Sequence, residues 1–314
     1  MIQPSRAAVQ LLLLATYLSP STALRVLLFG ASGNLGSRVL YQLTTCGHTV
    51  TAFVPSEQRL RAGFNDRKFD DVQVVEGDAL DKAAVVAAMA GGGSPYDVVV
   101  SAAGSVDNDA SSAEEAANTN FCRMFSNIAD AAEEHLPAPR RALFVGGITV
   151  LDVPGTSTSL QSLLSSRFHY SQYEAHVINL SKLRDSKLEW TLLCPGYLVD
   201  AAPSGCAPVG CEPTDEPLRL TADVVPAFEP TRAFKPWQLT RALKYPFVLL
   251  PFLLRKGEWT VPYESVASVL VANLAAGGAF ARTRVGLANP PGVKLQKTDA
   301  ARTRERSKRE RKST

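Results

Sequence analysis

The chain has 314 residues, 46% of them hydrophobic, and a formal net charge of +3. This composition predicts a soluble globular protein, and the chain is long enough to bury a sizeable hydrophobic core. The charge is uneven, because residues 294–314 hold nine Lys or Arg against three acidic residues. The segment 302–312 has no apolar residue with which to pack, so we expect a solvated basic tail and no specific nucleic-acid binding.

Residues 1–23 resemble a targeting segment. Arg6 precedes the mostly apolar stretch 7–18, and Ser21 and Ala23 supply small residues at a cleavage site. The apolar stretch is too short to span a bilayer comfortably, which favours a secretory signal peptide. No acidic residue occurs in this segment, so an organellar presequence is a competing interpretation, and an uncleaved arm packed on the domain is a third. We expect the chain to enter the secretory pathway or an organelle.

A strand that runs into a glycine-rich turn is the most informative motif. Residues 25–29 predict a buried parallel strand, and Leu35, Val39, Leu40 and Leu43 follow at helical spacing. Gly30 allows a tight reversal, Gly33 lacks the side chain that would hold a pyrophosphate away, and Gly36 lets the helix approach the strand. The motif predicts a dinucleotide site at a helix N-terminus, formed by Gly30, Ser32, Gly33, Asn34, Leu35 and Gly36.

Strands and helices alternate along the next part of the chain. We expect further strands over 48–54, 72–75, 97–101, 142–145 and 190–193, and helices over 80–90, 113–135 and 171–184. This alternation predicts an α/β fold with a doubly wound parallel sheet and helices on both faces. Ligands of such sheets lie at the carboxyl ends of the strands, where Gly30, Gly77, Ala103, Gly147 and Gly196 fall.

The alternation stops between residues 201 and 262. Ten prolines punctuate this stretch, which we interpret as a cap on the substrate side of a core formed by residues 24–200. Its apolar segment 245–254 could bind a protein partner or a membrane surface, although packing over the cleft is the preferred interpretation. A helix over 263–276 and a strand over 284–287 then complete the core within residues 263–293.

The five cysteines have no metal-binding spacing, and we expect no metal site. Cys46, Cys122 and Cys194 fall in predicted core elements and are expected to be buried thiols. Cys206 and Cys211 lie in a Pro/Gly-rich loop, where an oxidising compartment would permit a small disulfide.

Several motifs in this order resemble the atypical short-chain dehydrogenase/reductase superfamily, in its NAD(P)H-binding, NmrA-like and flavin-reductase-like branch. The resemblance implies a Rossmann-like fold in which Asp78 and Ala79 lie by the adenine. It also implies that Ala102, Ala103 and Gly104 line the cofactor and that Pro195 and Gly196 flank the nicotinamide. An alternative role for Asp78 is to cap the helix before Leu80. The carrying motifs are residues 30–36, 76–79, 99–104, 144–147 and 188–196.

The residues after the second predicted strand bear on the choice of cofactor. NAD enzymes place a carboxylate there for the ribose hydroxyls, whereas a 2′-phosphate requires cations or hydroxyls. Ser56 and Arg59 fit a phosphate, although Glu57 is close and Pro55 stands where the family often has arginine. The pattern favours NADP over NAD, with Arg59 as an ordinary solvated helix residue the alternative.

The Tyr-x-x-x-Lys pair of typical superfamily members is absent, since none of the eight tyrosines has lysine four residues later. Tyr170 lies in the expected region but is followed by Glu174, which would push the phenol pKa the wrong way. We take Tyr170 as the candidate for a substrate-facing hydroxyl, with aromatic packing over the cofactor as its alternative. His176 could relay a proton, but a hydrogen-bonded helix histidine is preferred.

These patterns favour one function and leave others open. The favoured hypothesis is an NADPH-dependent reductase of a planar or carbonyl small-molecule acceptor, in which the cofactor supplies the hydride. The alternative is a non-catalytic NAD(P)H sensor or assembly factor, suggested by the absent Tyr-Lys pair and the apolar segment 245–254. A sugar-nucleotide epimerase is third, because that chemistry usually depends on the absent pair.

Overall fold

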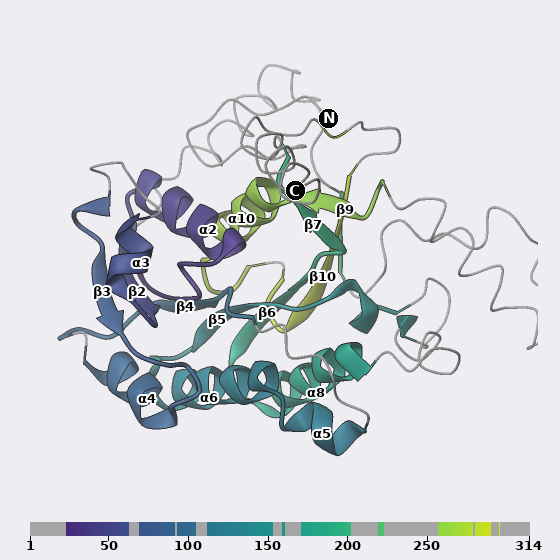
Figure 1. Ribbon diagram of the computed structural model, residues 1–314, viewed down its shortest axis with the longest axis horizontal. Coiled ribbons are helices and arrows are strands. Elements are labelled where there is room, and N and C mark those ends of the chain that lie inside the picture. Colours follow the sequence, from purple (N-terminus) through teal and green to yellow (C-terminus); the bar gives the residue numbers. More distant parts are fainter. Residues whose placement is uncertain are drawn as a thin grey trace, which may run out of the picture.

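A central sheet covered by helices on both faces forms the protein (Figure 1). The computed structural model describes residues 23–62, 69–91, 93–104, 112–152, 159–160, 171–201, 219–222, 257–278, 280–289 and 295. The predicted targeting segment, the apolar segment 245–254, Tyr170, Cys206 and Cys211 lie outside the described residues, as does the basic tail apart from one residue. Within the described chain, no helix has the length and apolar character needed to cross a membrane.

The sheet has seven parallel strands and one antiparallel edge strand, β8, which pairs with β10. A separate pair is formed by β7 (Tyr197–Val199) and β9 (Thr260–Pro262). The predicted doubly wound α/β sheet is thereby confirmed. In spatial order the eight strands are β3 (Gln73–Glu76), β2 (Thr49–Val54), β1 (Arg25–Phe29), β4 (Val98–Ser101), β5 (Arg141–Val145), β6 (Glu189–Cys194), β10 (Thr283–Ala288) and β8 (Arg219–Ala222).

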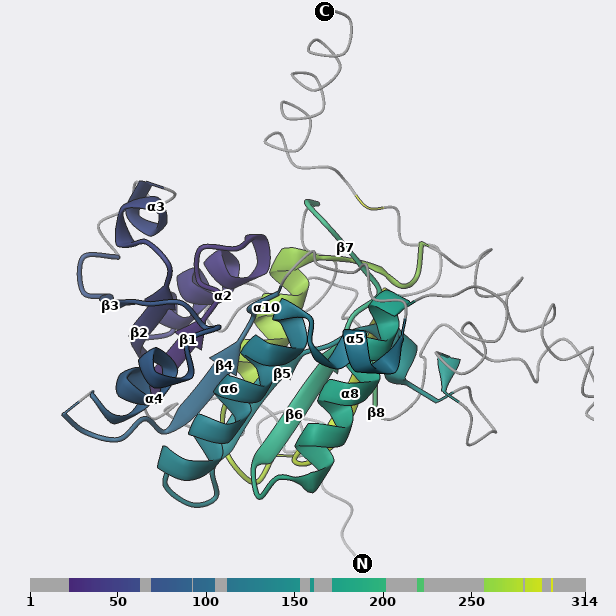
Figure 2. The same cartoon turned by 60° about the horizontal axis from the view of Figure 1, so that its bottom comes forward.

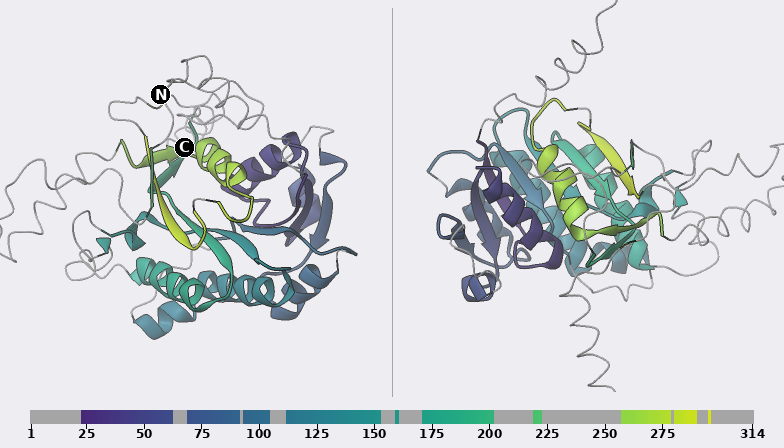
Figure 3. Two further views of the ribbon diagram at one scale, coloured as in Figure 1. Left: turned by 180° about the vertical axis from the view of Figure 1, so that it is seen from behind. Right: turned by 90° about the horizontal axis from the view of Figure 1, so that it is seen from above.

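The helices form two layers, which Figures 1 and 2 show on opposite faces of the sheet. One layer holds α2 (Asn34–Thr45), α3 (Glu57–Ala62) and α10 (Tyr263–Ala272). The other holds α4 (Lys82–Ala90), α5 (Ala113–Ala117), α6 (Asn120–His135) and α8 (Ser171–Asp185). Seen from behind and above, α10 lies beside α2, so the C-terminal helix packs on the helix that opens the fold (Figure 3).

Strand β1 shows how the sequence pattern builds the two cores. Leu27 and Phe29 belong to the core under α4, α6 and α8, whereas Val26 and Leu28 belong to the core under α2 and α10. All four residues are fully buried. Successive side chains of a strand point to opposite faces, so a strand buried on both sides must be apolar at every position. This explains why residues 26–29 form an unbroken apolar run.

Helix boundaries differ from the sequence prediction where side chains cap backbone groups. The predicted helix over 113–135 is two helices, because the chain turns at Asn118 and the Thr119 hydroxyl accepts a hydrogen bond from the Cys122 N–H (3.3 Å). The helix predicted to begin at residue 80 begins at Lys82, because the Asp81 carboxylate accepts from the N–H groups of Ala83 and Ala84.

The C-terminal elements also depart from expectation. Helix α10 ends at Ala272, where Arg141 donates to the Asn273 carbonyl (2.6 Å). Strand β8 lies within the predicted cap 201–262 yet belongs to the main sheet. The predicted domain boundaries stay predictions. Of the three cysteines expected to be buried, Cys122 and Cys194 are buried thiols, whereas Cys46 is only partly covered.

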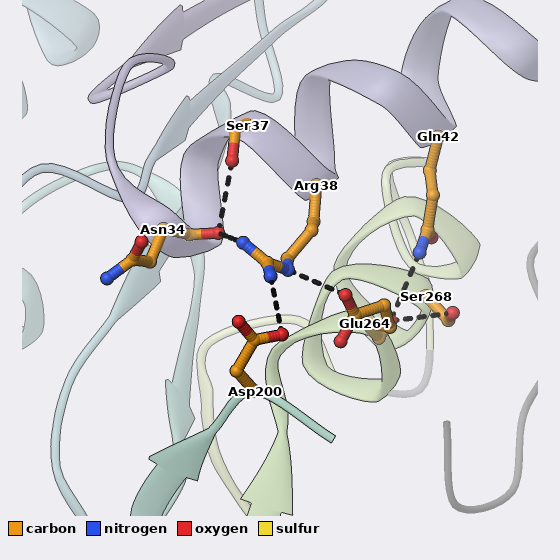
Figure 4. Close-up of polar contacts among 7 residues, drawn as sticks. All are labelled: Asn34, Ser37, Arg38, Gln42, Asp200, Glu264 and Ser268. Atoms are coloured by element: carbon orange, nitrogen blue, oxygen red, sulfur yellow. Dashed lines mark hydrogen bonds and ion pairs between the residues drawn. The ribbon is translucent and has the colours of Figure 1, made fainter. Parts of the chain in front are cut away.

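Arg38 of α2 joins three parts of the fold (Figure 4). Its guanidinium donates to the Glu264 carboxylate on α10 (2.7 Å), to the Asp200 carboxylate just after β7 (3.0 Å) and to the Asn34 carbonyl (2.7 Å). It also lies over the Tyr263 ring, 5.1 Å from the centroid. The three ionised side chains are only 17–27% exposed, so solvent screens this cluster less than a surface pair.

We predict that Arg38→Met lowers the free energy of unfolding by about 2 kcal/mol, because it leaves two partly buried carboxylates without their cation. Denaturant unfolding measures this. Lys82→Met is the matched control, since the Lys82–Asp130 pair is more exposed (61% and 34%), and it should cost no more than about 0.5 kcal/mol. Equal losses in the two variants would contradict the structural role of Arg38.

Candidate functional site

The strand order reverses between β1 and β4, and the glycine-rich turn lies at the carboxyl ends of these strands. β1 pairs with β2 on one side and with β4 on the other. Crossovers leave a doubly wound sheet in opposite directions at such a point, which opens a crevice where ligands of this fold class bind. The turn that begins at Gly30 therefore occupies the position expected of a binding site.

Two glycines make this turn possible. Gly30 has φ of +79°, and a Cβ atom there would lie 2.6 Å from the Ala103 nitrogen in the segment after β4. A Cβ atom on Gly36 would lie 2.0 Å from the Gly30 carbonyl oxygen. The backbone of the turn is thus in direct contact with the segment after β4 at Gly30 and with the first turn of α2 at Gly36. These contacts confirm the predicted roles of Gly30 in the turn and of Gly36 in helix–strand packing.

The N-terminus of α2 faces outward without a capping side chain. Gly33 is the N-cap residue, and no acidic residue occurs in the first turn of this 12-residue helix. Ser32, Gly33 and Asn34 are exposed. The first N–H groups of a helix have no partner within the helix and carry its positive dipole end, so this arrangement suits an anion.

Ser56 and helix α3, which carries Glu57 and Arg59, follow the carboxyl end of β2. The Ser56 hydroxyl accepts from the Arg59 N–H (3.3 Å), and the Glu57 carboxylate pairs with Arg61 (2.6 Å). The Glu76 carboxylate, at the end of β3, accepts from the Glu57 N–H (2.6 Å). Within the described residues, the exposed Arg59 guanidinium has no partner. This corner therefore holds one unpaired cation, one paired carboxylate and a second carboxylate bound to the backbone.

Asp78 and Ala79 lie in the turn between β3 and α4. Asp78 accepts from the Leu80 N–H (2.9 Å), but the helix cap is Asp81, so the alternative that Asp78 caps the helix is wrong. Asn127 of α6 donates to the carbonyls of Ala79 and Leu80 (3.0 and 3.1 Å). This pair of bonds fixes the turn against the helix layer.

A cavity of about 200 Å³ lies at the carboxyl ends of β5 and β6. It is bounded by Gly147 and by the short 3₁₀ helix η2 (Ile148–Val150), and by Pro195 and Gly196 after β6. The Ile148 N–H donates to the Pro195 carbonyl (3.0 Å), which ties the two walls together. The structure thus brings the predicted residues Gly147, Pro195 and Gly196 to one cavity.

His176 of α8 also lines this cavity. Its ring lies at the glycine wall, because a Cβ atom on Gly147 would be 3.0 Å from its Nε2 and Cδ2 atoms, and it meets Phe121 edge-on at 5.1 Å. Nδ1 is covered and has no hydrogen-bond partner in the described structure, and the preferred interpretation of a hydrogen-bonded helix histidine stays a prediction. Burial lowers the pKa of His176 to about 4, which keeps the imidazole neutral near pH 7.

Several residues of this cavity were not predicted from the sequence, and three of them carry polar or aromatic side chains. Thr149, Tyr197 and Trp259 line it. Thr149 and Tyr197 each follow a glycine at a strand end by one or two residues, and this spacing could have identified them. Trp259 lies 62 residues beyond Tyr197 in the chain and stacks on it (4.9 Å between ring centroids), a contact that no local pattern signals.

No cluster of His, Cys, Asp or Glu that could hold a metal ion occurs among the described residues. Gly77 and the segment 102–104 lie at the same edge of the sheet as the glycine turn, after β3 and β4. Tyr170, the candidate for a substrate-facing hydroxyl, lies outside the described residues, and its role stays a prediction.

We predict that His176 makes the stability of the protein depend on pH. The unfolded imidazole has the ordinary pKa of 6.5 and binds a proton before the folded one does, so stability falls as the pH decreases from 6.5 towards 4. Between pH 7.5 and 5, wild type should lose about 2 kcal/mol more than His176→Phe in denaturant unfolding. Identical pH dependence of the two proteins would contradict the buried, neutral state of this histidine.

Comparison with known proteins identifies the family. A model of a family described as NAD(P)H-binding matches residues 30–219, more than half of the chain. No curated protein matches the chain. The matched segment begins at Gly30, the first glycine of the turn described above.

Solved structures with low sequence identity share the fold. A protein described as exported, from Burkholderia pseudomallei, has 22% identity and a TM-score of 0.55, over 84% of this chain and 99% of its own. The anaerobillin reductase ChuY from Escherichia coli O157:H7 has 20% identity and a TM-score of 0.52 (86% and 98%). A protein assigned as an NADH-flavin reductase, from Streptococcus pneumoniae, has 18% identity and a TM-score of 0.52 (85% and 100%). The chain belongs to the NAD(P)H-binding family.

Proposed function

We propose that the protein is an NADPH-dependent reductase of a small planar or carbonyl acceptor. The observation that carries this proposal is the uncapped N-terminus of α2 at the point where the strand order reverses. The cavity beside Gly147 and Gly196 lies at the same edge of the sheet and supplies space for a reacting ring. The names of two structural neighbours, an anaerobillin reductase and an NADH-flavin reductase, agree with this class of reaction.

The residues present fit a dinucleotide. The N–H groups of Ser32, Asn34 and Leu35, at the start of α2, would bind the pyrophosphate, whereas the Gly33 N–H already donates to the Gly30 carbonyl (2.9 Å). Gly30 and Gly36 supply the close backbone approach that shapes the turn. Asp78 and Ala79 would lie by the adenine, and the segment 102–104 would line the cofactor. Gly147, Pro195 and Gly196 would flank the nicotinamide.

The protein contributes position and exclusion of water, because the redox chemistry belongs to the cofactor. When bound, the dihydronicotinamide would supply a hydride, and solvent would supply the one proton that completes the dihydro product as it leaves the cavity. The covered walls of the cavity, among them Ile148 and Trp259, keep bulk water from the reacting ring. Tyr170 is our candidate for a hydroxyl that faces the acceptor.

Gly33→Asp tests the phosphate site. Aspartate is a better N-cap than glycine, so this variant should unfold at an equal or higher denaturant concentration than wild type. Its carboxylate would occupy and repel the place of the pyrophosphate, so the Kd for NADPH should rise roughly 100-fold. A fluorescence titration measures the affinity. Gly33→Asn, which places an uncharged cap of the same size there, should lose less NADPH affinity than Gly33→Asp. Unchanged NADPH affinity in Gly33→Asp would refute the phosphate site.

Reductase activity requires a separate measurement. Purified protein should oxidise NADPH in the presence of at least one acceptor from a panel that contains a quinone, a flavin and an aldehyde. Gly33→Asp should lose this activity at NADPH concentrations that saturate wild type. Tight NADPH binding without oxidation by any acceptor of the panel would contradict the reductase function while leaving the nucleotide site intact.

The preference for NADPH rests on the corner formed by α3 and β3. Ser56 and the unpaired Arg59 offer a hydroxyl and a cation to a 2′-phosphate, and Arg61 neutralises the Glu57 carboxylate (2.6 Å). The Glu76 carboxylate disfavours NADPH, because its negative charge would repel the 2′-phosphate. It also occupies the Glu57 N–H, which could otherwise donate to that phosphate. We infer that the attraction of the 2′-phosphate by Ser56 and Arg59 outweighs its repulsion by Glu76.

Two substitutions separate these contributions. Arg59→Ala should weaken NADPH binding by about tenfold and leave NADH binding nearly unchanged, because only NADPH carries a 2′-phosphate. Glu76→Gln should strengthen NADPH binding, since the amide carries no repelling charge. Arg123→Ala, an exposed arginine on α6, is the control. Equal losses for NADPH and NADH in Arg59→Ala would contradict the assignment.

A further inference from the structure

One wall of the cavity beside Gly147 is an aromatic stack. The rings of Tyr197 and Trp259 lie 4.9 Å apart between centroids and within 27° of parallel. Trp259 is 4% exposed, whereas Tyr197 keeps 51% of its surface exposed. A half-exposed aromatic ring backed by a buried one presents a flat apolar surface, onto which another ring can stack with a gain beyond simple burial.

The chain holds this wall in place from two sides. A Cβ atom on Gly196 would lie 2.1 Å from the Trp259 carbonyl oxygen, so the strand end and the tryptophan backbone are in direct contact. The buried Asn289 side chain donates to the carbonyls of Gly257 and Thr260 (3.0 and 2.6 Å), on either side of Trp259. The aromatic wall is therefore preorganised, which reduces the entropy lost when a ligand binds.

Two polar side chains that line the cavity have a covered atom without a partner. Neither Nδ1 of His176 nor Oγ1 of Thr149 has a hydrogen-bond partner in the described structure. A buried polar atom left unpaired costs free energy, which a ligand group can recover once the side chain turns that atom towards the cavity. The His176 imidazole is neutral, and a neutral imidazole donates one hydrogen bond and accepts one. Such a ring can act as a neutral donor to a carbonyl oxygen.

The other side chains at this wall are uncharged. Ile148, Leu198 and the two aromatic rings are apolar over most of their surface. A sulfonate, phosphate or carboxylate placed among them would lose its hydration without meeting a cation at the described lining, which is strongly unfavourable. An uncharged ring with a carbonyl oxygen would lose little hydration free energy on entering the cavity.

From this geometry we propose that Tyr197 and His176 determine acceptor specificity: Tyr197 stacks on an uncharged, planar ring, and His176 hydrogen-bonds to a carbonyl oxygen of that ring. This inference rests on the proposed reductase function and narrows its acceptor to neutral cyclic carbonyl compounds such as quinones. Thr149 is placed to add a second hydrogen bond once its hydroxyl turns towards the ligand.

A matched pair of quinones tests the selectivity. 1,4-Naphthoquinone and its 2-sulfonate share the ring system, and the sulfonate is the stronger oxidant, so driving force alone favours the charged compound. We expect wild type to bind the neutral quinone at least about tenfold more tightly, measured by calorimetry with saturating 1,4,5,6-tetrahydro-NADP, whose nicotinamide ring is uncharged and cannot transfer a hydride. The kcat/KM for NADPH oxidation should follow the same order. Equal or tighter binding of the sulfonate would overturn the inference.

Variants assign the selectivity to residues. Tyr197→Ala should weaken naphthoquinone binding by about tenfold without changing NADPH affinity, and Tyr197→Phe should retain it. Tyr41→Ala is the matched control, because Tyr41 is the other large exposed aromatic residue of the described chain (42%) and lies on α2. His176→Phe should reduce kcat/KM for the quinone by about tenfold, and His176→Asn should recover part of that loss.

The outcomes separate the two proposals. If Tyr197→Ala binds naphthoquinone like wild type, or if it loses NADPH affinity instead, the assignment of Tyr197 to the acceptor is refuted while the reductase function stands. If no acceptor supports NADPH oxidation but the neutral quinone still binds in a Tyr197-dependent manner, the reductase function is refuted and the selectivity of the pocket is supported.

Discussion

The contact between the Gly30 carbonyl and Gly36 is the constraint on which the site depends. Only a residue without a Cβ atom permits this approach, since such an atom would lie 2.0 Å from the carbonyl oxygen. The contact sets the start of α2 directly over the end of β1, next to the turn after β4. As a result, the uncapped N-terminus of the helix lies at the point where the strand order reverses. A longer or looser turn would move the positive end of the helix away from that crevice.

The rest of the structure holds this arrangement from the C-terminal side. Arg38 lies one turn into α2 and binds both the Asn34 carbonyl, at the start of the helix, and the Glu264 carboxylate on α10 (Figure 4). Through Asp200 it also reaches the end of β7, the strand that begins with Tyr197. One guanidinium thus connects the proposed phosphate site with the strand that carries the proposed acceptor wall. The Arg38 guanidinium is satisfied within the fold, so in the proposed site the pyrophosphate is bound by backbone groups.

Local patterns predicted most of the fold but only part of the site. The apolar run of β1 and the glycine turn are continuous in sequence, and the structure has the predicted sheet and turn. The division of residues 113–135 into α5 and α6 depends on the Thr119 cap, a local signal that helical periodicity conceals. By contrast, the partners of Arg38 lie 162 and 226 residues away, and the stack of Tyr197 on Trp259 forms only when β7 pairs with β9. Burial of His176 beside Gly147 is likewise a tertiary effect, so its neutral state could not be derived from its neighbours in the chain.

The central claim is that main-chain amides at the start of α2 bind a diphosphate. Backbone amide chemical shifts, followed by NMR while NADPH is added, test it most directly. The account predicts that the largest shifts, with downfield movement typical of charge-assisted hydrogen bonds, occur at the amides of Ser32, Asn34, Leu35 and Gly36. Saturation with NADPH that leaves these amides unmoved while others shift would contradict it.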